Sequence, residues 1–211
     1  FGFLRMGTGG MTSQAYGSRN GDECRNILLR SLSISVLLAL SLIILQSIIV
    51  STAFIFIDTG TEVKAYATKY FHICIWGAPA VLGLYSFTGW FLGMQNSRYP
   101  MFIAITQNVI NIAASLFLVR EMGMKIEGVA YGTLIAQYAG LLMAILLGLK
   151  YTKNYTWNIS ARQLFCRKSM SVFFRVNRDI FFRTLCIVAV TVFFTSSGAG
   201  YGDTTLAVNT L

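Results

Sequence analysis

Charged residues are scarce in this chain of 211 residues: they make up 12% of it, where an average soluble domain carries about 25%. Hydrophobic residues make up 55%, and the mean hydropathy is +0.62. This composition excludes an ordinary soluble domain and indicates an integral membrane protein. In such a protein, chain length sets the number of spanning helices rather than the size of a water-excluding core.

Residues that commonly carry out chemistry are also few. The four cysteines (Cys24, Cys74, Cys166 and Cys186) form no CxxC pair, which argues against a metal site or disulfides. No GxSxG or phosphate-binding loop occurs, and no span contains paired carboxylates, so we expect a protein that is not an enzyme, with no cofactor. The one histidine, His72, lies near the start of an apolar run; it is interpreted as an interfacial polar residue, with a proton relay as the alternative.

Long uncharged runs are what the sequence does contain. Each is close to or above the roughly 20 residues that cross a bilayer, and the sequence therefore predicts five spanning helices: 31–57, 70–97, 99–119, 128–149 and 184–202. Residues 1–18 are predicted to end a preceding helix, and the residues after Asp203 to begin another, so we expect part of a longer protein. Loops are predicted at 19–30 and 58–69, and Pro79 with nearby glycines predicts a bend.

The basic residues indicate an orientation. Eight lysines and arginines lie between Lys150 and Arg183, and the alternate loops bring the count on that side to twelve, against four on the other. The positive-inside rule therefore places this linker in the cytoplasm. The net charge of +9 lies between apolar spans rather than on one soluble face, so the sequence argues against a nucleic-acid partner and for the lipid bilayer.

A polar face interrupts two of the apolar runs. Asn108, Asn111 and Ser115 are spaced i, i+3, i+7, and Thr133 and Gln137 are spaced i, i+4 in the next run. A short turn makes these two helices antiparallel neighbours, so the two faces are expected to meet. Two interpretations stay open: a polar binding pocket within the bundle, or hydrogen bonds that only hold the helices together.

Arg5 is the one cation predicted to lie deep in a span. It stands about four helical turns before the first loop, roughly 20 Å into the helix. A charge at that depth requires a position inside the bundle and a partner, which we expect outside this chain. The alternative is an arginine that snorkels or binds backbone carbonyls.

Four segments in this order resemble one family: FGFLRMGTGGMTSQAYG, IWGAPAVLGLYSFTGWFLGMQNSR, GTLIAQYAGLL and RVNRDIFFRTLCIVAV. Together they resemble the multidrug and toxic compound extrusion (MATE) transporters, most of all the DinF-like bacterial branch. The resemblance implies an all-α integral membrane fold of twelve helices in two lobes. It would place the end of helix 2 and helices 3–6 of the N-lobe in 1–149, an inter-lobe linker in 150–177 and the start of the C-lobe, helix 7 and the beginning of helix 8, in 178–211.

The resemblance also implies a function. Family members export organic, often cationic compounds across the cytoplasmic membrane in exchange for H⁺ or Na⁺, so we expect a secondary transporter, monomeric, with small organic substrates. The family's helix-5 Asn corresponds to Asn111 and its helix-6 Thr to Thr133. Ser115 stands at a family Asp position and cannot titrate, so a proton-binding role for this helix is in doubt.

Other classes of function stay open from the sequence alone. A lipid-linked sugar flippase of the same superfamily would need a wide cationic cavity, and Arg5 is the clear intramembrane cation. A membrane enzyme would need converging His, Asp or Glu within the spans. A structural or anchoring subunit would show no response to a coupling cation.

Overall fold

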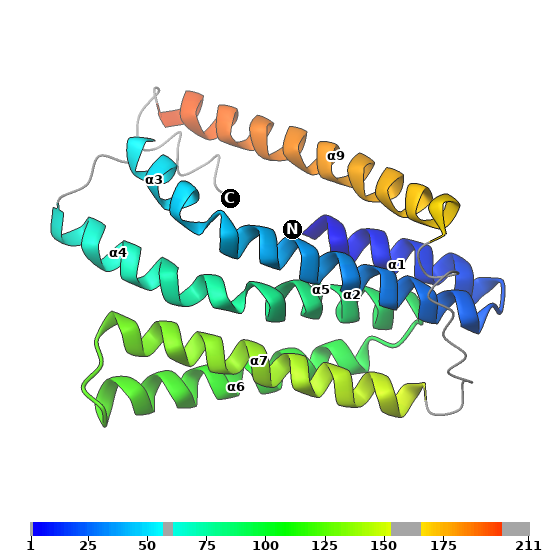
Figure 1. Cartoon of the computed structure of the whole chain (residues 1–211), viewed down its shortest axis with the longest axis horizontal. Helices are drawn as coiled ribbons and strands as arrows, with labels where there is room; N and C mark the ends of the chain where they lie inside the picture. The colour runs from blue at the N-terminus through cyan, green and yellow to red at the C-terminus, as the bar shows by residue number, and fades with distance from the viewer. Residues whose placement is uncertain (1, 57–60, 153–165, 200–211) are drawn as a thin grey trace. The chain divides into compact units, whose positions relative to one another are not determined.

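The computed structural model describes the chain except residues 1, 57–60, 153–165 and 200–211 (Figure 1). The described residues form helices and no strand. They divide into two units, Phe1–Phe165 and Cys166–Leu211, which are treated separately below. The helices of the first unit are α1 Gly2–Gly17, α2 Gly21–Ile44, α3 Gln46–Phe56, α4 Thr61–Cys74, the 3₁₀ turn η1 Ile75–Gly77, α5 Ala78–Gly93, α6 Arg98–Arg120 and α7 Ile126–Tyr151.

Four helices of the described part are long and apolar enough to cross a membrane: Gly21–Ile44, Lys64–Gly93, Arg98–Arg120 and Ile126–Tyr151. They correspond to the first four predicted spans. The fifth, 184–202, begins inside the helix of the second unit, α9 Arg167–Ala199, and ends outside the described residues. The described spans therefore make this a multi-pass membrane protein.

Helix α5 organises the first unit, because it contacts α1, α2, α6 and α7. Its Trp90 is 1% exposed and donates from Nε1 to the Cys24 carbonyl of α2, at 2.9 Å. The Trp90 ring also packs edge-on against Tyr151, and Phe91 packs edge-on against Tyr99. These rings join four helices at one end of the bundle, near the predicted cytoplasmic surface.

The predicted loop at 19–30 is wrong for most of its length. Helix α2 already begins at Gly21, because the Asn20 side chain accepts a hydrogen bond from the Glu23 backbone N–H at 3.0 Å and caps the helix. Acidic residues in the first turn favour the positive end of the helix dipole. Arg30 therefore lies in the helix, buried, and pairs with Glu23 at 2.6 Å.

Two of the predicted spans are interrupted. The run 31–57 breaks at Leu45 into α2 and α3, and the run 70–97 is interrupted by η1. The helix of this second run also begins earlier than predicted, at Thr61, inside the predicted loop. Near Pro79, where a bend is predicted, the 3₁₀ turn η1 at Ile75–Gly77 separates α4 from α5. Proline lacks an N–H and its ring clashes with the carbonyl four residues earlier, which here belongs to Ile75.

The basic segment predicted as a linker is helical at both ends. Lys150 belongs to the last turn of α7, and α9 begins at Arg167. The boundary between the two units falls between Phe165 and Cys166, inside the predicted linker. Charge-free runs mark only the membrane-buried part of a helix, so helices that extend into the headgroup region are longer than the sequence suggests.

Candidate functional site

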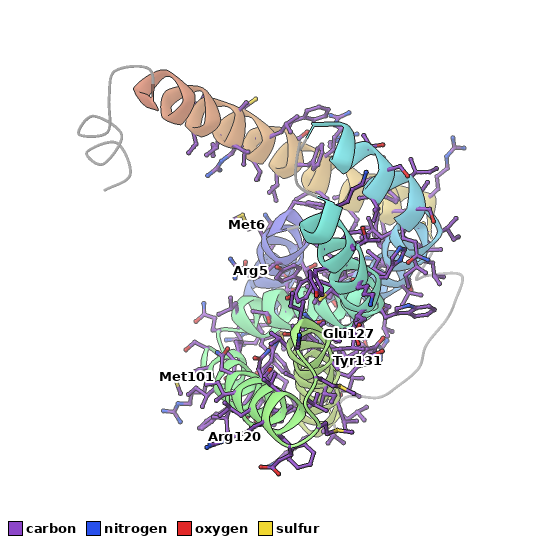
Figure 2. The ribbon with its side chains drawn as sticks, turned by 90° about the vertical axis from the view of Figure 1, so that its left-hand side faces the viewer. Arg5, Met6, Met101, Arg120, Glu127 and Tyr131 are labelled. Atoms are coloured by element: carbon purple, nitrogen blue, oxygen red, sulfur yellow. The ribbon has the colours of Figure 1, made fainter. Side chains whose placement is uncertain are left out.

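The candidate site lies on the hairpin of α6 and α7, which run antiparallel beside each other (Figure 1). Gly123, at φ +65°, turns the chain between them in a conformation that a side chain disfavours. An ion pair of 3.5 Å between Lys69 and Glu127 ties the start of α7 to α4. Figure 2 shows Glu127 and Tyr131 on this first part of α7.

Small residues recur every fourth position along α7, and all are buried: Gly128, Gly132, Ala136, Gly140, Ala144 and Gly148. Such a stripe lets helix backbones approach closely in a membrane. A Cβ at Gly132 would lie 2.8 Å from the Ser115 backbone nitrogen of α6, whereas one at Gly148 would meet Phe87 of α5. Four residues turn a helix by about 400°, which is about 40° more than one full turn. The stripe therefore winds around α7, and its neighbour changes from α6 to α5 along the helix.

The polar face of the hairpin is partly assembled as predicted. Asn111 donates from Nδ2 to the Thr133 hydroxyl at 3.2 Å, and that hydroxyl donates to the Val129 carbonyl at 3.0 Å. The buried Ser115 hydroxyl lies against Gly132, the residue that precedes Thr133 in α7. This hydroxyl has no hydrogen-bond partner within the described residues. Asn111, Ser115 and Thr133 therefore share one interface at bilayer depth.

Asn108 and Gln137 do not join this interface. Asn108 is exposed on α6. Gln137 turns toward the 3₁₀ turn, where a Cβ at Gly77 would lie 3.1 Å from its Cδ atom. The next residue, Tyr138, donates from its hydroxyl to the Trp76 carbonyl at 2.8 Å, so α7 contacts the broken helix at two successive side chains.

The prediction that Arg5 lies inside the bundle, with a charge partner outside this chain, stays a prediction. The Arg5 side chain is exposed, as Figure 2 shows for Arg5 on α1. Its backbone instead packs against α5, where a Cβ at Gly89 would lie 3.1 Å from the Arg5 carbonyl carbon. His72 is half-buried and lies 3.3 Å from the Gln46 side chain, which joins α4 to the start of α3.

A buried hydroxyl cluster was missed by the sequence reasoning. The Ser31 and Ser86 hydroxyls are 2.7 Å apart, as are those of Thr8 and Ser31 and of Ser35 and Ser86. The Ser35 hydroxyl also donates to the Ser31 carbonyl at 2.8 Å, and all four residues are at most 1% exposed. The available signal was the i, i+4 spacing of Ser31 and Ser35 within a charge-free run. The cluster joins α1, α2 and α5 by hydrogen bonds that have no competition from water.

Replacing Ser86 with alanine is expected to destabilise the protein by about 1 to 2 kcal/mol, because the Ser31 and Ser35 hydroxyls both lose a partner in a dry site. Thermal unfolding of the detergent-purified protein measures this. The matched control is Ser33→Ala, since the Ser33 hydroxyl donates to the Leu29 carbonyl of its own helix. Equal stability of the two variants would show that the cluster contributes nothing between helices.

Comparison with known proteins decides the family. The family model described as MatE matches residues 1–117. The chain belongs to the MatE family. DNA damage-inducible protein F of Escherichia coli (strain K12) is 31% identical over 211 residues, covering 98% of this chain and 45% of that protein. Probable multidrug resistance protein YoeA of Bacillus subtilis (strain 168) is 26% identical over 144 residues, covering 66% and 31%.

The fold agrees with this assignment. A MOP superfamily transporter from Pyrococcus furiosus superposes with a TM-score of 0.82 at 21% identity, covering 99% of this chain and 46% of that one. The predicted MATE-type helical fold and the resemblance to the DinF branch are confirmed. The chain spans less than half the length of these relatives. Members of the MatE family are transporters, and the membrane-spanning helices suit that activity.

Proposed function

We propose that the protein is a secondary, cation-coupled antiporter that exports organic, often cationic compounds across the cytoplasmic membrane by alternating access. The family assignment supports transport. Two adjacent candidate spans, α6 and α7, also meet through a polar interface rather than a wholly apolar one. Polar groups at bilayer depth are costly, and in transporters they mark the sites of ions and substrates.

The Asn111–Thr133 hydrogen bond is the observation that carries the proposal. It places an amide and a hydroxyl from two spanning helices 3.2 Å apart, beside the buried Ser115 hydroxyl. All three groups are neutral at every physiological pH, so they supply oxygen ligands or orient a charged partner but do not bind a proton themselves. Hard cations such as Na⁺ prefer oxygen ligands of this kind. A titrating group for H⁺ coupling would have to come from another part of the protein.

Coupling requires that the cation and the organic substrate favour different conformations. A ligand with equal affinity for both states shifts no equilibrium, so exchange follows from differential affinity. Helix α7 connects the site to a structural break: Thr133 contacts α6, and one turn later Gln137 and Tyr138 contact η1. We infer that occupation of the site changes how α7 holds the bend beside Pro79.

The test is gradient-driven efflux of several fluorescent organic cations from proteoliposomes that contain the full-length protein. Imposed Na⁺ and H⁺ gradients are compared separately, with ionophores that collapse each one as controls. Efflux that follows one gradient and stops with its ionophore supports the proposal. Absence of gradient-dependent efflux for every dye, in protein shown to be folded, contradicts it.

The proposed orientation gives a separate prediction from the cysteines. Cys166 is exposed and lies in the basic segment, whereas Cys24 is 2% exposed. In intact cells, a membrane-impermeant maleimide is expected to leave Cys166 unlabelled and a permeant maleimide to label it, in a variant that retains Cys166 as its one thiol. A variant that retains only Cys24 is expected to resist both reagents until the protein is denatured. Labelling of Cys166 by the impermeant reagent would show that the basic segment lies outside the cell and would contradict the proposed orientation.

A further inference from the structure

The second candidate span is divided into α4 and α5 by the 3₁₀ turn η1. Pro79 has no N–H to offer to the Ile75 carbonyl, and this carbonyl accepts a hydrogen bond from the Ala78 N–H instead. The neighbouring Trp76 carbonyl accepts the Tyr138 hydroxyl of α7 at 2.8 Å. A different helix therefore binds the backbone of the break, and the geometry of η1 depends on α7.

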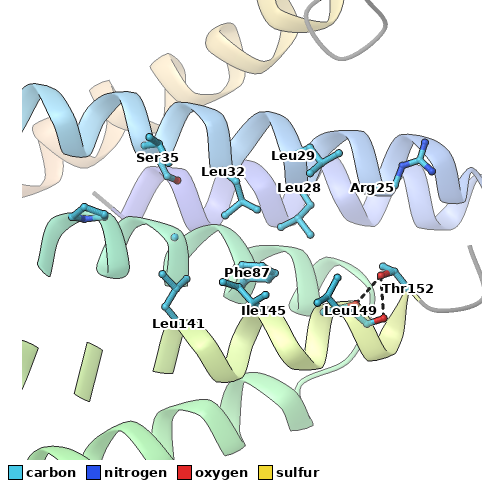
Figure 3. A pocket seen from close by; sticks show the side chains of 14 residues that line it. Arg25, Leu28, Leu29, Leu32, Ser35, Phe87, Leu141, Ile145, Leu149 and Thr152 are labelled. Atoms are coloured by element: carbon cyan, nitrogen blue, oxygen red, sulfur yellow. Dashed lines mark hydrogen bonds between the residues drawn. The ribbon is translucent and has the colours of Figure 1, made fainter. Parts of the chain in front are cut away.

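The two sides of this break differ in burial. Most residues of α5 are buried, and Figure 3 shows Phe87 of α5 between Leu28 of α2 and Ile145 of α7. No described side chain of α4, from Lys64 to Cys74, is buried. Segments with few buried contacts move at low cost in free energy, and lipid is as apolar as the side chains that it covers. We therefore expect movement of this span in α4, with α5 held in place.

Polar contacts attach α4 to α7 at two levels. Lys69 of α4 pairs with Glu127 of α7 at 3.5 Å, and these side chains are 63% and 48% exposed. An ion pair with this exposure is weak and is screened by salt. The Tyr138–Trp76 hydrogen bond holds the other level, at the break. Contacts of this strength form and break readily, which suits a reversible attachment.

Gln137 introduces an opposing contribution. Its side chain lies where a side chain at Gly77 would stand, since a Cβ there would be 3.1 Å from the Gln137 Cδ atom. The Gln137 Oε1 atom is buried and has no hydrogen-bond partner within the described residues. A buried acceptor without a donor costs free energy, so movement of η1 away from α7 relieves a cost as it breaks the Tyr138 contact. The attached arrangement of α4 is therefore not favoured by every contact that holds it.

We propose that α4 is a hinged gate that turns on η1 and closes against α7 at the predicted outer end of the bundle, with the Tyr138–Trp76 hydrogen bond as its latch. Thr133 lies about one helical turn before Tyr138, so the Asn111–Thr133 site and the latch act on the same segment of α7. The role as a gate rests on the proposed transport function, because alternating access opens one end of a transporter at a time. The movement of α4 does not rest on it and is measured separately.

The experiment measures the distance between two spin labels by pulsed electron paramagnetic resonance, on the full-length protein in lipid nanodiscs and without its native cysteines. Labels at Ala67→Cys of α4 and Phe117→Cys of α6 report the gate, and both positions are exposed. Tyr138→Phe keeps the ring and removes the hydroxyl, so we expect the ratio of long to short distances to rise about threefold or more. Tyr131→Phe is the matched control, because Tyr131 is exposed on the same helix and its hydroxyl makes no hydrogen bond within the described residues.

The ion pair is tested with Glu127→Gln, which is expected to shift the same ratio in the same direction. High salt is expected to reproduce this shift in the wild-type protein and to add little to it in the variant. The matched control is Glu121→Gln, because Glu121 is exposed and forms no ion pair within the described residues. Labels at Leu92→Cys of α5 and Phe117→Cys are expected to keep one distance in every variant, since α5 lies beyond the hinge.

Equal distance distributions for the wild type, Tyr138→Phe and Glu127→Gln would overturn the gate. A shift of the α5 label pair as large as that of the α4 pair would also overturn it, because the whole bundle would then be loosened. Efflux separates this proposal from the proposed function. Movement of α4 without export of any dye supports the hinge and contradicts transport, whereas export by a protein whose α4 does not move contradicts the gate alone.

Discussion

Replacing Gly89 with alanine is expected to destabilise the protein by about 1 to 3 kcal/mol, the usual cost of overpacking a well-filled interface. Helices α1 and α5 meet here backbone to backbone. A Cβ at Gly89 would lie 3.1 Å from the Arg5 carbonyl carbon and 3.2 Å from its Cα, and still closer to the carbonyl oxygen. Backbone atoms cannot rotate away as the end of a side chain does, so one of the two helices must shift. Thermal unfolding in detergent measures the loss.

Gly10→Ala is the matched control for this prediction. Gly10 lies on the same helix as Arg5, and a Cβ there meets nothing within 4 Å among the described residues. Alanine is the better helix former by up to about 1 kcal/mol, so this variant is expected to be as stable as the wild type or slightly more stable. Equal melting temperatures for Gly89→Ala and Gly10→Ala would show that α1 and α5 do not pack as closely as the structure indicates.

The sequence predicted the membrane architecture because charge and apolar length act locally. A run without charge that is long enough to cross the bilayer has few alternatives to a spanning helix. The contact of Asn111 with Thr133 could be predicted for a similar reason: helical spacing places polar residues on one face, and a tight turn brings the two faces together. Both inferences need only neighbouring residues and one connection.

Other features depended on contacts that periodicity does not specify. Gln137 lies four residues after Thr133, so the spacing places both on one face of α7. The packed side of α7 winds around the helix, however, and Gln137 meets Gly77 of η1 instead of α6. Asn108 lies on the predicted polar face, yet that edge of α6 is exposed. Arg30 belongs to a helix rather than a loop because Asn20, ten residues earlier, caps the start of α2. Each outcome is set by tertiary packing or by a cap, which a count of charges does not detect.

The partners that meet in the hydroxyl cluster could not be predicted for a further reason. Ser35 and Ser86 are 51 residues apart, and no local pattern relates them. Sites of this kind are visible in a structure and not in a single sequence.

Replacing Asn111 with leucine is expected to lower gradient-driven efflux roughly tenfold, which corresponds to about 1.4 kcal/mol in the coupled step. Leucine has the same branched arrangement of heavy atoms but cannot donate to Thr133 or offer an oxygen to a cation. The Thr133 hydroxyl keeps its bond to the Val129 carbonyl, so the substitution leaves no buried hydroxyl without a partner. The loss should therefore appear in transport rather than in folding, and initial efflux rates per folded protein measure it.

Asn108→Leu separates a binding role of Asn111 from a general effect of polarity in α6. Asn108 lies one turn earlier on the same helix but is exposed and outside the Asn111–Thr133 interface, so efflux is expected to stay within about twofold of the wild type. If the Asn111→Leu protein needs a higher concentration of the coupling cation than the wild type to reach half of its maximal rate, its cation affinity is weakened. Loss of interhelical packing alone would not produce this shift. Wild-type efflux by a stable Asn111→Leu protein would reduce the hydrogen bond to a contact that only holds two helices together, and the proposed cation site would then have to lie elsewhere.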